Sequence, residues 1–169
     1  MRLIIPILTM LSALVAILSG CNTVGCTENR SSIPLAVFYA SGTNRQLAID
    51  SVAVGGVDAP GDSLLVKPQR GTSQFYLPLR SQTDVTSFFI SYRWEGMPER
   101  YNDTLTFQYS SMPYFASEEC GAMYRYRIQR MEYTTHMLDS VVILDSLITN
   151  AEIPSIRLYY TTGQDDENS

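Results

Sequence analysis

The chain has 169 residues, and its 17 acidic and 12 basic side chains give a formal net charge of −5. This length accommodates one domain with a substantial core, and 45% hydrophobic with 17% charged residues is typical of a globular protein rather than a disordered or multi-spanning one. The acidic balance excludes nucleic acid as an expected partner, because phosphate binding requires clustered lysine and arginine. A single lysine, Lys67, and a single histidine, His136, leave few catalytic bases or metal ligands.

Residues 1–20 have the features of an export signal. Arg2 adds to the positive charge of the amino terminus, and an uncharged, mostly apolar stretch occupies residues 3–18. This stretch is shorter than the roughly 20 residues of a spanning helix and is typical of a secretory signal. It ends in Leu-Ser-Gly-Cys at positions 18–21, which resembles the bacterial lipobox. We therefore expect cleavage before Cys21 and attachment of lipid, with acyl chains such as palmitate, to its thiol. The alternative is an ordinary signal peptide followed by a coincidental cysteine.

A lipid on Cys21 would hold the mature chain on a membrane, outside the cytoplasm. Asn22 stands where an aspartate directs retention in the inner membrane, so the sequence favours the outer membrane. Residues 22–25 lack the acidic run that surface-displayed lipoproteins often carry. We therefore expect the periplasmic face, with surface exposure as the alternative.

The other two cysteines, Cys26 and Cys120, become a pair if Cys21 is acylated. In an oxidising compartment they are expected to form a disulfide. The bond would close a loop of nearly a hundred residues, worth roughly 4–5 kcal/mol in the chain-entropy model. Two buried thiols, or one redox-active thiol, are the alternatives.

The mature chain is dominated by short runs of β-branched and aromatic residues between turn formers, which predict strands. The clearest is 103–109, where Leu105, Phe107 and Tyr109 alternate with polar residues. The expected strands cover residues 33–39, 47–54, 63–66, 74–79, 87–94, 103–109, 123–131, 140–144 and 153–160. Residues 137–148 also allow a helix, but the β-branched run at 141–143 favours a strand.

This spacing predicts an all-β fold: a single antiparallel β-sandwich, Ig-like or related, of about eight or nine strands. The sandwich is expected over residues 33–162, after a tether at 21–32 and before a disordered acidic tail at 163–169.

No catalytic constellation is apparent in the sequence. His136 is not preceded by any nucleophile-elbow pattern, and a turn or surface histidine is the simpler interpretation. Among the acids, Glu118 and Glu119 adjoin Cys120, while Glu95 and Glu99 flank a turn; a glycosidase would need two such carboxylates across a cleft. We expect no catalytic residue, no metal site and no cofactor.

Aromatic residues are the remaining candidates for ligand binding, since exposed rings bind sugars and peptides. Tyr92 and Trp94 alternate onto one face of a predicted strand, and Tyr101, Tyr114 and Phe115 fall in predicted loops. The alternative is that these rings fill or cover the sandwich core.

Several segments together resemble a family of small, uncharacterised Bacteroidota lipoproteins, classified as a domain of unknown function. The matching features are Cys21 followed closely by Cys26, and the segments at 34–38, 77–79, 103–109, 117–121 and 156–160. The resemblance implies lipid attachment and a β-rich domain in which Cys26 and Cys120 pair. It carries no known activity, so no catalytic residue is transferred.

The expected function is that of a lipid-anchored, non-enzymatic envelope protein that binds or supports another envelope component. Its partners would be the membrane, through Cys21, and an envelope protein or glycan. A carbohydrate- or peptide-binding module that uses Trp94 and the nearby tyrosines is the alternative, and a glycosidase comes third.

Overall fold

The computed structural model describes residues 32–93, 97–118 and 120–161. The predicted signal peptide, all of the predicted tether except Ser32, and the acidic tail lie outside the described residues. The same holds for Cys21, Cys26 and Trp94, and for Glu95 and Glu119.

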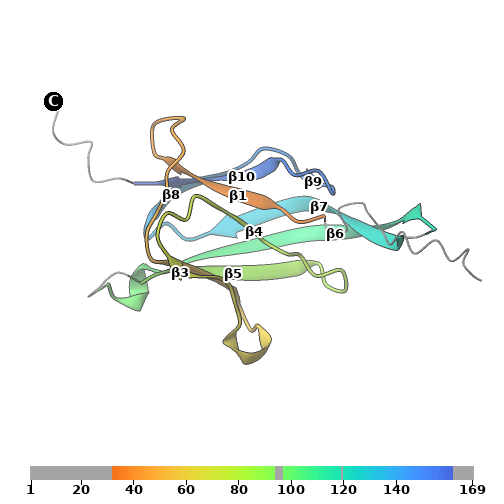
Figure 1. Cartoon of the computed structure of the whole chain (residues 1–169), viewed down its shortest axis with the longest axis horizontal. Coiled ribbons are helices and arrows are strands. Elements are labelled where there is room, and N and C mark those ends of the chain that lie inside the picture. Colours follow the sequence, from red (N-terminus) through yellow and green to blue (C-terminus); the bar gives the residue numbers. More distant parts are fainter. Residues whose placement is uncertain (1–31, 94–96, 119, 162–169) are drawn as a thin grey trace, which may run out of the picture.

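The described chain is all-β and contains ten strands in two sheets, with two short 3₁₀ turns, η1 (Pro60–Asp62) and η2 (Glu99–Tyr101) (Figure 1). The strands are β1 (Leu35–Ala40), β2 (Val52–Gly56), β3 (Leu64–Gln69), β4 (Gln74–Tyr76), β5 (Val85–Tyr92), β6 (Asp103–Ser117), β7 (Gly121–Tyr133), β8 (Leu138–Ile143), β9 (Leu147–Ile148) and β10 (Pro154–Tyr160). Residues 137–148 therefore contribute strands, not a helix, as their β-branched run indicated.

The four-stranded sheet has the order β4-β1-β10-β8 and pairs the first and last strands of the described chain. β1 and β10 run parallel, with Phe38 opposite Leu158, while β4 and β8 flank them in antiparallel fashion. The predicted all-β fold is confirmed, but the parallel β1–β10 pair and the curled larger sheet differ from the predicted single antiparallel, Ig-like sandwich. Most of the chain joins β1 to β10, and a parallel pair requires such a long connection. β4 lies at the edge of this sheet, which accommodates Pro78 just beyond it.

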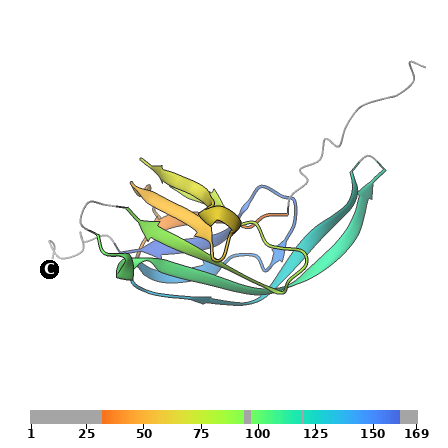
Figure 2. The same cartoon turned by 90° about the horizontal axis from the view of Figure 1, so that it is seen from below.

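The six-stranded sheet has the order β3-β2-β5-β6-β7-β9, is antiparallel throughout and curls into a half-barrel (Figure 2). β3 is an edge strand and continues through Pro68 to Gln69, beyond its predicted end at Val66. An edge strand tolerates proline because one side of its backbone needs no hydrogen-bond donor.

The core lies between the two sheets and is rich in aromatic rings. Leu105, Phe107 and Tyr109 are buried, and the residues between them are only partly buried, which confirms the alternation predicted for 103–109. Tyr160 of the smaller sheet packs on Tyr92 of the larger sheet with ring centres 5.7 Å apart. Burying each such side chain contributes about 1.5–3 kcal/mol, so these contacts hold the sheets together.

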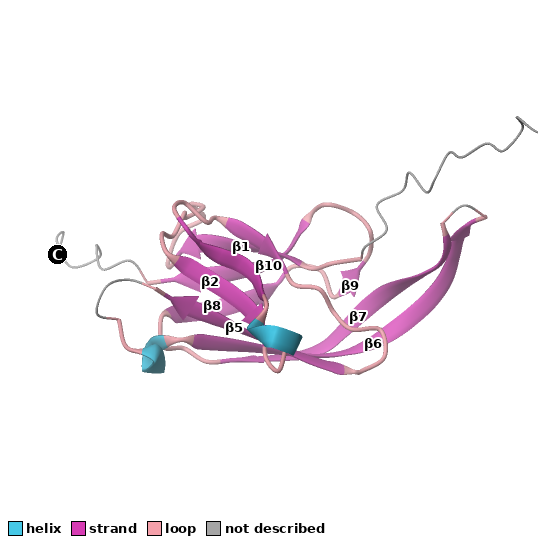
Figure 3. Ribbon diagram, turned by 60° about the horizontal axis from the view of Figure 1, so that its bottom comes forward, coloured by secondary structure: helices cyan, strands magenta, loops and turns pink. Residues whose placement is uncertain are grey.

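The β6–β7 hairpin extends well beyond the rest of the molecule (Figures 2 and 3). Pairing with β5 ends at Gln108, and β9 pairs only with Tyr126 and Arg127. We call residues 110–118 and 120–127 of this hairpin the arm; past the pairing of Tyr126 with β9 it is a two-stranded ribbon. Tyr114 and Phe115 lie in β6 of the arm and not in the predicted loop.

Candidate functional site

The most elaborate polar cluster surrounds Asp103, at the start of β6, whose side chain is fully buried. Its carboxylate accepts hydrogen bonds from the backbone N–H groups of His136 (2.8 Å), Met137 (3.0 Å) and Leu138 (3.0 Å). The Tyr92 hydroxyl (2.9 Å) and the hydroxyl of Thr134 (2.8 Å) donate two more. Five donors satisfy a buried carboxylate, which otherwise carries a large desolvation cost.

This cluster joins the two sheets. Asp103 and Tyr92 belong to the six-stranded sheet, whereas Leu138 begins β8 in the four-stranded sheet. Burial, and then the neighbouring Asp103 carboxylate, raise the pKa of Tyr92 well above its usual value near 10, so its hydroxyl remains a donor. The geometry is that of a structural clamp around the β7–β8 connection.

His136 lies beside this clamp, with its side chain about half exposed. Its Nδ1 atom is 3.6 Å from a carboxylate oxygen of Asp103 and 2.8 Å from the carbonyl oxygen of Asn102. An aspartate–histidine pair acts in catalysis by activating a nucleophile. In the part of the chain that the structure describes, no hydroxyl or thiol hydrogen-bonds to this ring.

Tyr109 holds the base of the arm. Its hydroxyl lies 2.7 Å from the Thr86 hydroxyl, accepts from the backbone N–H of Arg80 (3.0 Å) and donates to the Arg80 carbonyl (2.8 Å). Its ring meets Tyr126 edge-on at 5.5 Å between centres. These contacts fasten the β4–β5 connection to both strands of the hairpin, so the arm projects from a fixed base.

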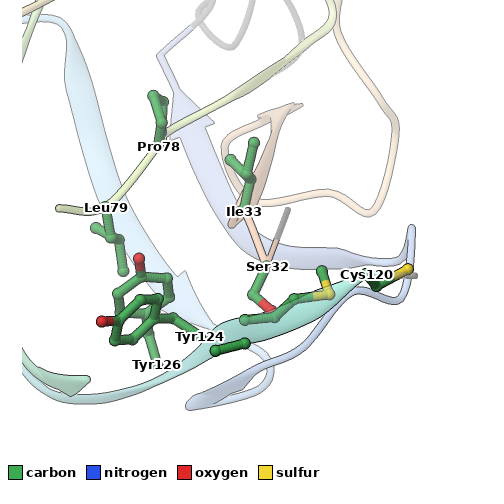
Figure 4. A pocket seen from close by; sticks show the side chains of 9 residues that line it. Ser32, Ile33, Pro78, Leu79, Cys120, Tyr124 and Tyr126 are labelled. Atoms are coloured by element: carbon green, nitrogen blue, oxygen red, sulfur yellow. The ribbon is translucent and has the colours of Figure 1, made fainter. Parts of the chain in front are cut away.

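A pocket of about 380 Å³ lies between the arm and the start of β1 (Figure 4). Its lining comes from three separate parts of the chain: Ser32, Ile33, Pro78, Leu79, Cys120, Ala122, Met123, Tyr124 and Tyr126. In Figure 4 the Tyr124 and Tyr126 rings lie near Leu79 at one end, with Ser32 and Cys120 toward the other. The chain thus reaches the domain next to the turn of the arm.

The outer part of the arm exposes an apolar face. Pro113 pairs with Tyr124, and Phe115 pairs with Ala122, so these four side chains lie together on one side of the ribbon. All four are exposed, Phe115 by 71% and Tyr124 by 40%. We call these four residues the apolar tip.

Two arginines of β7, Arg125 and Arg127, are exposed and project from the face of the ribbon opposite to the apolar tip. The Arg125 guanidinium stacks on the Tyr114 ring at 4.2 Å. Neither arginine forms an ion pair with any described residue. They can therefore meet an external anionic group.

The predicted ligand-binding aromatics are not brought together. Tyr92 is only 2% exposed, because β5 is a central strand and this ring lies in the core. The Tyr92 ring is therefore not part of an exposed binding surface. Tyr101 lies in η2 and Tyr114 in the arm, at opposite ends of β6. Trp94 lies outside the described residues.

The candidate carboxylates are also separated. Glu118 is exposed at the turn of the arm, whereas Glu99 lies in η2 and faces Arg93 at 3.9 Å. Among the residues that the structure describes, no three His, Cys, Asp or Glu side chains gather as a metal site would require. Cys120 lies in the turn between β6 and β7, and its backbone N–H donates to the Ser117 hydroxyl.

Sequence reasoning missed the pocket and the apolar tip. The pocket is assembled from segments far apart in the chain, so no local pattern marks it. The signal for the tip was the Pro-Tyr-Phe run at 113–115. A prediction of residues 110–127 as a hairpin would have placed this apolar cluster on one exposed ribbon.

The comparisons with known proteins give one finding. A model for a family of unknown function, DUF6452, matches residues 51–160, which is more than half of the chain and includes the arm. No curated protein and no solved structure matches. The chain therefore belongs to DUF6452, a family of unknown function.

Proposed function

We propose that this protein is a lipid-anchored, non-enzymatic component of the bacterial cell envelope that binds or supports another envelope component. The observation that carries the proposal is the Leu-Ser-Gly-Cys sequence at 18–21 after an uncharged apolar stretch. The described residues contain no helix with the length and hydropathy needed to cross a bilayer.

The position of the first described residue supports a fixed tether. Ser32 and Cys120 line the same pocket, and Cys26 lies six positions before Ser32. Six residues span at most roughly 20 Å, so Cys26 is within reach of the turn of the arm. We propose that a Cys26–Cys120 disulfide fastens the tether to the arm.

For the location, we propose the periplasmic face of the outer membrane in a bacterium of the Bacteroidota. Asn22 and the absence of an acidic run after Cys21 support this assignment. Display on the cell surface is the alternative, and protease accessibility in intact cells distinguishes the two.

Metabolic labelling tests the anchor. Cells that express the chain and receive an alkyne-tagged fatty acid should label the native protein, and Cys21→Ala should lose the label and leave the membrane fraction. Cys26→Ala is the matched control, because it removes a nearby thiol but leaves the lipobox intact. Persistent labelling of Cys21→Ala would refute the acylation site.

Thiol alkylation tests the disulfide. When the wild-type protein is unfolded without a reductant, an alkylating agent should modify no cysteine. Reduction should then release two thiols. Cys26→Ser should make Cys120 reactive without reductant. Ready alkylation of Cys120 in the native chain would show that the pair does not form.

A further inference from the structure

We propose that the apolar tip of the arm rests in the interface of a zwitterionic phospholipid bilayer, the same bilayer that holds the lipid anchor. The tip consists of Pro113, Phe115, Ala122 and Tyr124, as defined above. The proposal rests on the lipid anchor at Cys21. It adds a second contact with the membrane, which attachment through the lipid does not require.

The tip has the composition of a membrane-interface contact. Phe115 exposes 71% of its surface on a ribbon that no other strand of the described residues covers, and the exposure of this apolar ring to water is unfavourable. Aromatic side chains with a polar end, such as that of Tyr124, concentrate at the level of lipid headgroups. Apolar side chains beside them bury in the boundary between headgroups and acyl chains.

The tip itself carries no charged side chain. Arg125 and Arg127 alternate with Ala122 and Tyr124 along β7, so they project from the opposite face of the ribbon. A tip that is neutral overall fits a zwitterionic headgroup, which carries both a phosphate and an amine, better than a strongly anionic surface.

The length of the tether places the tip close to the bilayer. Cys21 lies eleven positions before Ser32, a span of at most roughly 40 Å, and the chain reaches the domain beside the arm. With Cys26 bonded to Cys120, only five positions separate the lipid from the turn of the arm, at most roughly 18 Å. The end of β10 lies at the opposite end of the molecule from the arm (Figure 3).

The experiment uses Phe115→Trp in the lipidated full chain, purified in detergent and reconstituted into phosphatidylcholine vesicles with brominated acyl chains. The matched control is Leu65→Trp, on a side chain that is 44% exposed on β3, at the sheet edge remote from β7. The parent chain gives the background from Trp94. Flotation of the vesicles on a density gradient reports the anchor separately.

We expect all chains to float with the vesicles. The fluorescence of the tryptophan at position 115 should be quenched at least about twofold more than that of the tryptophan at position 65, because the bromines quench only rings near the acyl chains. Adding Ala122→Asp, an exposed neighbour of residue 115, should lower the quenching while flotation persists. Equal quenching at the two positions, or no effect of Ala122→Asp, would overturn the proposal and leave the tip to a protein partner. Failure to float would refute the anchor itself, and the tip contact would fall with it.

Discussion

Replacing Asp103 tests how the two sheets are held together. In Asp103→Ala, three backbone N–H groups at 136–138 and two hydroxyls lose a buried acceptor at 2.8–3.0 Å. Each buried N–H left without a partner costs about 1–3 kcal/mol, and water that enters the vacated space brings the sum toward its lower end. We therefore expect the free energy of unfolding to fall by about 3–5 kcal/mol, a large part of the stability of a domain this size.

Urea denaturation followed by circular dichroism measures this change. Asp103→Asn keeps the volume of the side chain and removes its charge, but its amide N–H₂ group faces other hydrogen-bond donors. We expect this variant to lower the free energy of unfolding by about 1–3 kcal/mol. Glu99→Gln is the control, since its exposed carboxylate forms only a 3.9 Å ion pair, and such changes stay within about 0.5 kcal/mol. A loss below about 1 kcal/mol in Asp103→Ala would refute the clamp.

Three further predictions follow from buried and exposed positions. Above pH 10 the unfolded chain releases the Tyr92 proton while the folded chain, with its raised pKa, keeps it, so stability falls as pH rises. Tyr92→Phe should make the slope of unfolding free energy against pH less steep by about 1.4 kcal/mol per unit; an unchanged slope would contradict the pKa shift. Gly55→Val should cost about 1–3 kcal/mol in urea unfolding, because a Cβ there lies 2.5 Å from the Phe89 ring; a neutral effect would show that the ring moves freely. Phe115→Ser should change the unfolding free energy by less than about 0.5 kcal/mol; a larger loss would mean that Phe115 packs within the fold.

The sequence predicted strands from two patterns: alternation, where only one face is buried, and a continuous apolar run, where both faces are buried. The alternation at 103–109 and the apolar run before Ala40 both mark observed strands. The parallel pairing of β1 with β10 had no local signal, because it joins segments more than a hundred residues apart. β9 was missed because two residues are too few to show a period.

The arm was underestimated for a physical reason. Beyond Gln108 the hairpin leaves the core, so burial no longer imposes an alternating pattern, and Pro113 suggests an interruption. That proline is tolerated because none of the described strands pairs with the other side of β6 at this point. Tyr92 was named as a candidate ligand-binding residue although its ring is buried. The sequence alone does not show whether the face of a strand that carries an aromatic residue is covered or exposed.

The intact mass of the protein extracted from bacterial membranes shows whether Cys21 is the lipidated first residue of the mature chain. We expect a chain that begins at Cys21 and carries the added mass of its acyl chains, with reduction adding two hydrogen masses as the Cys26–Cys120 bond opens. A chain that retains residue 1, or that begins at Cys21 without added lipid, would contradict this expectation.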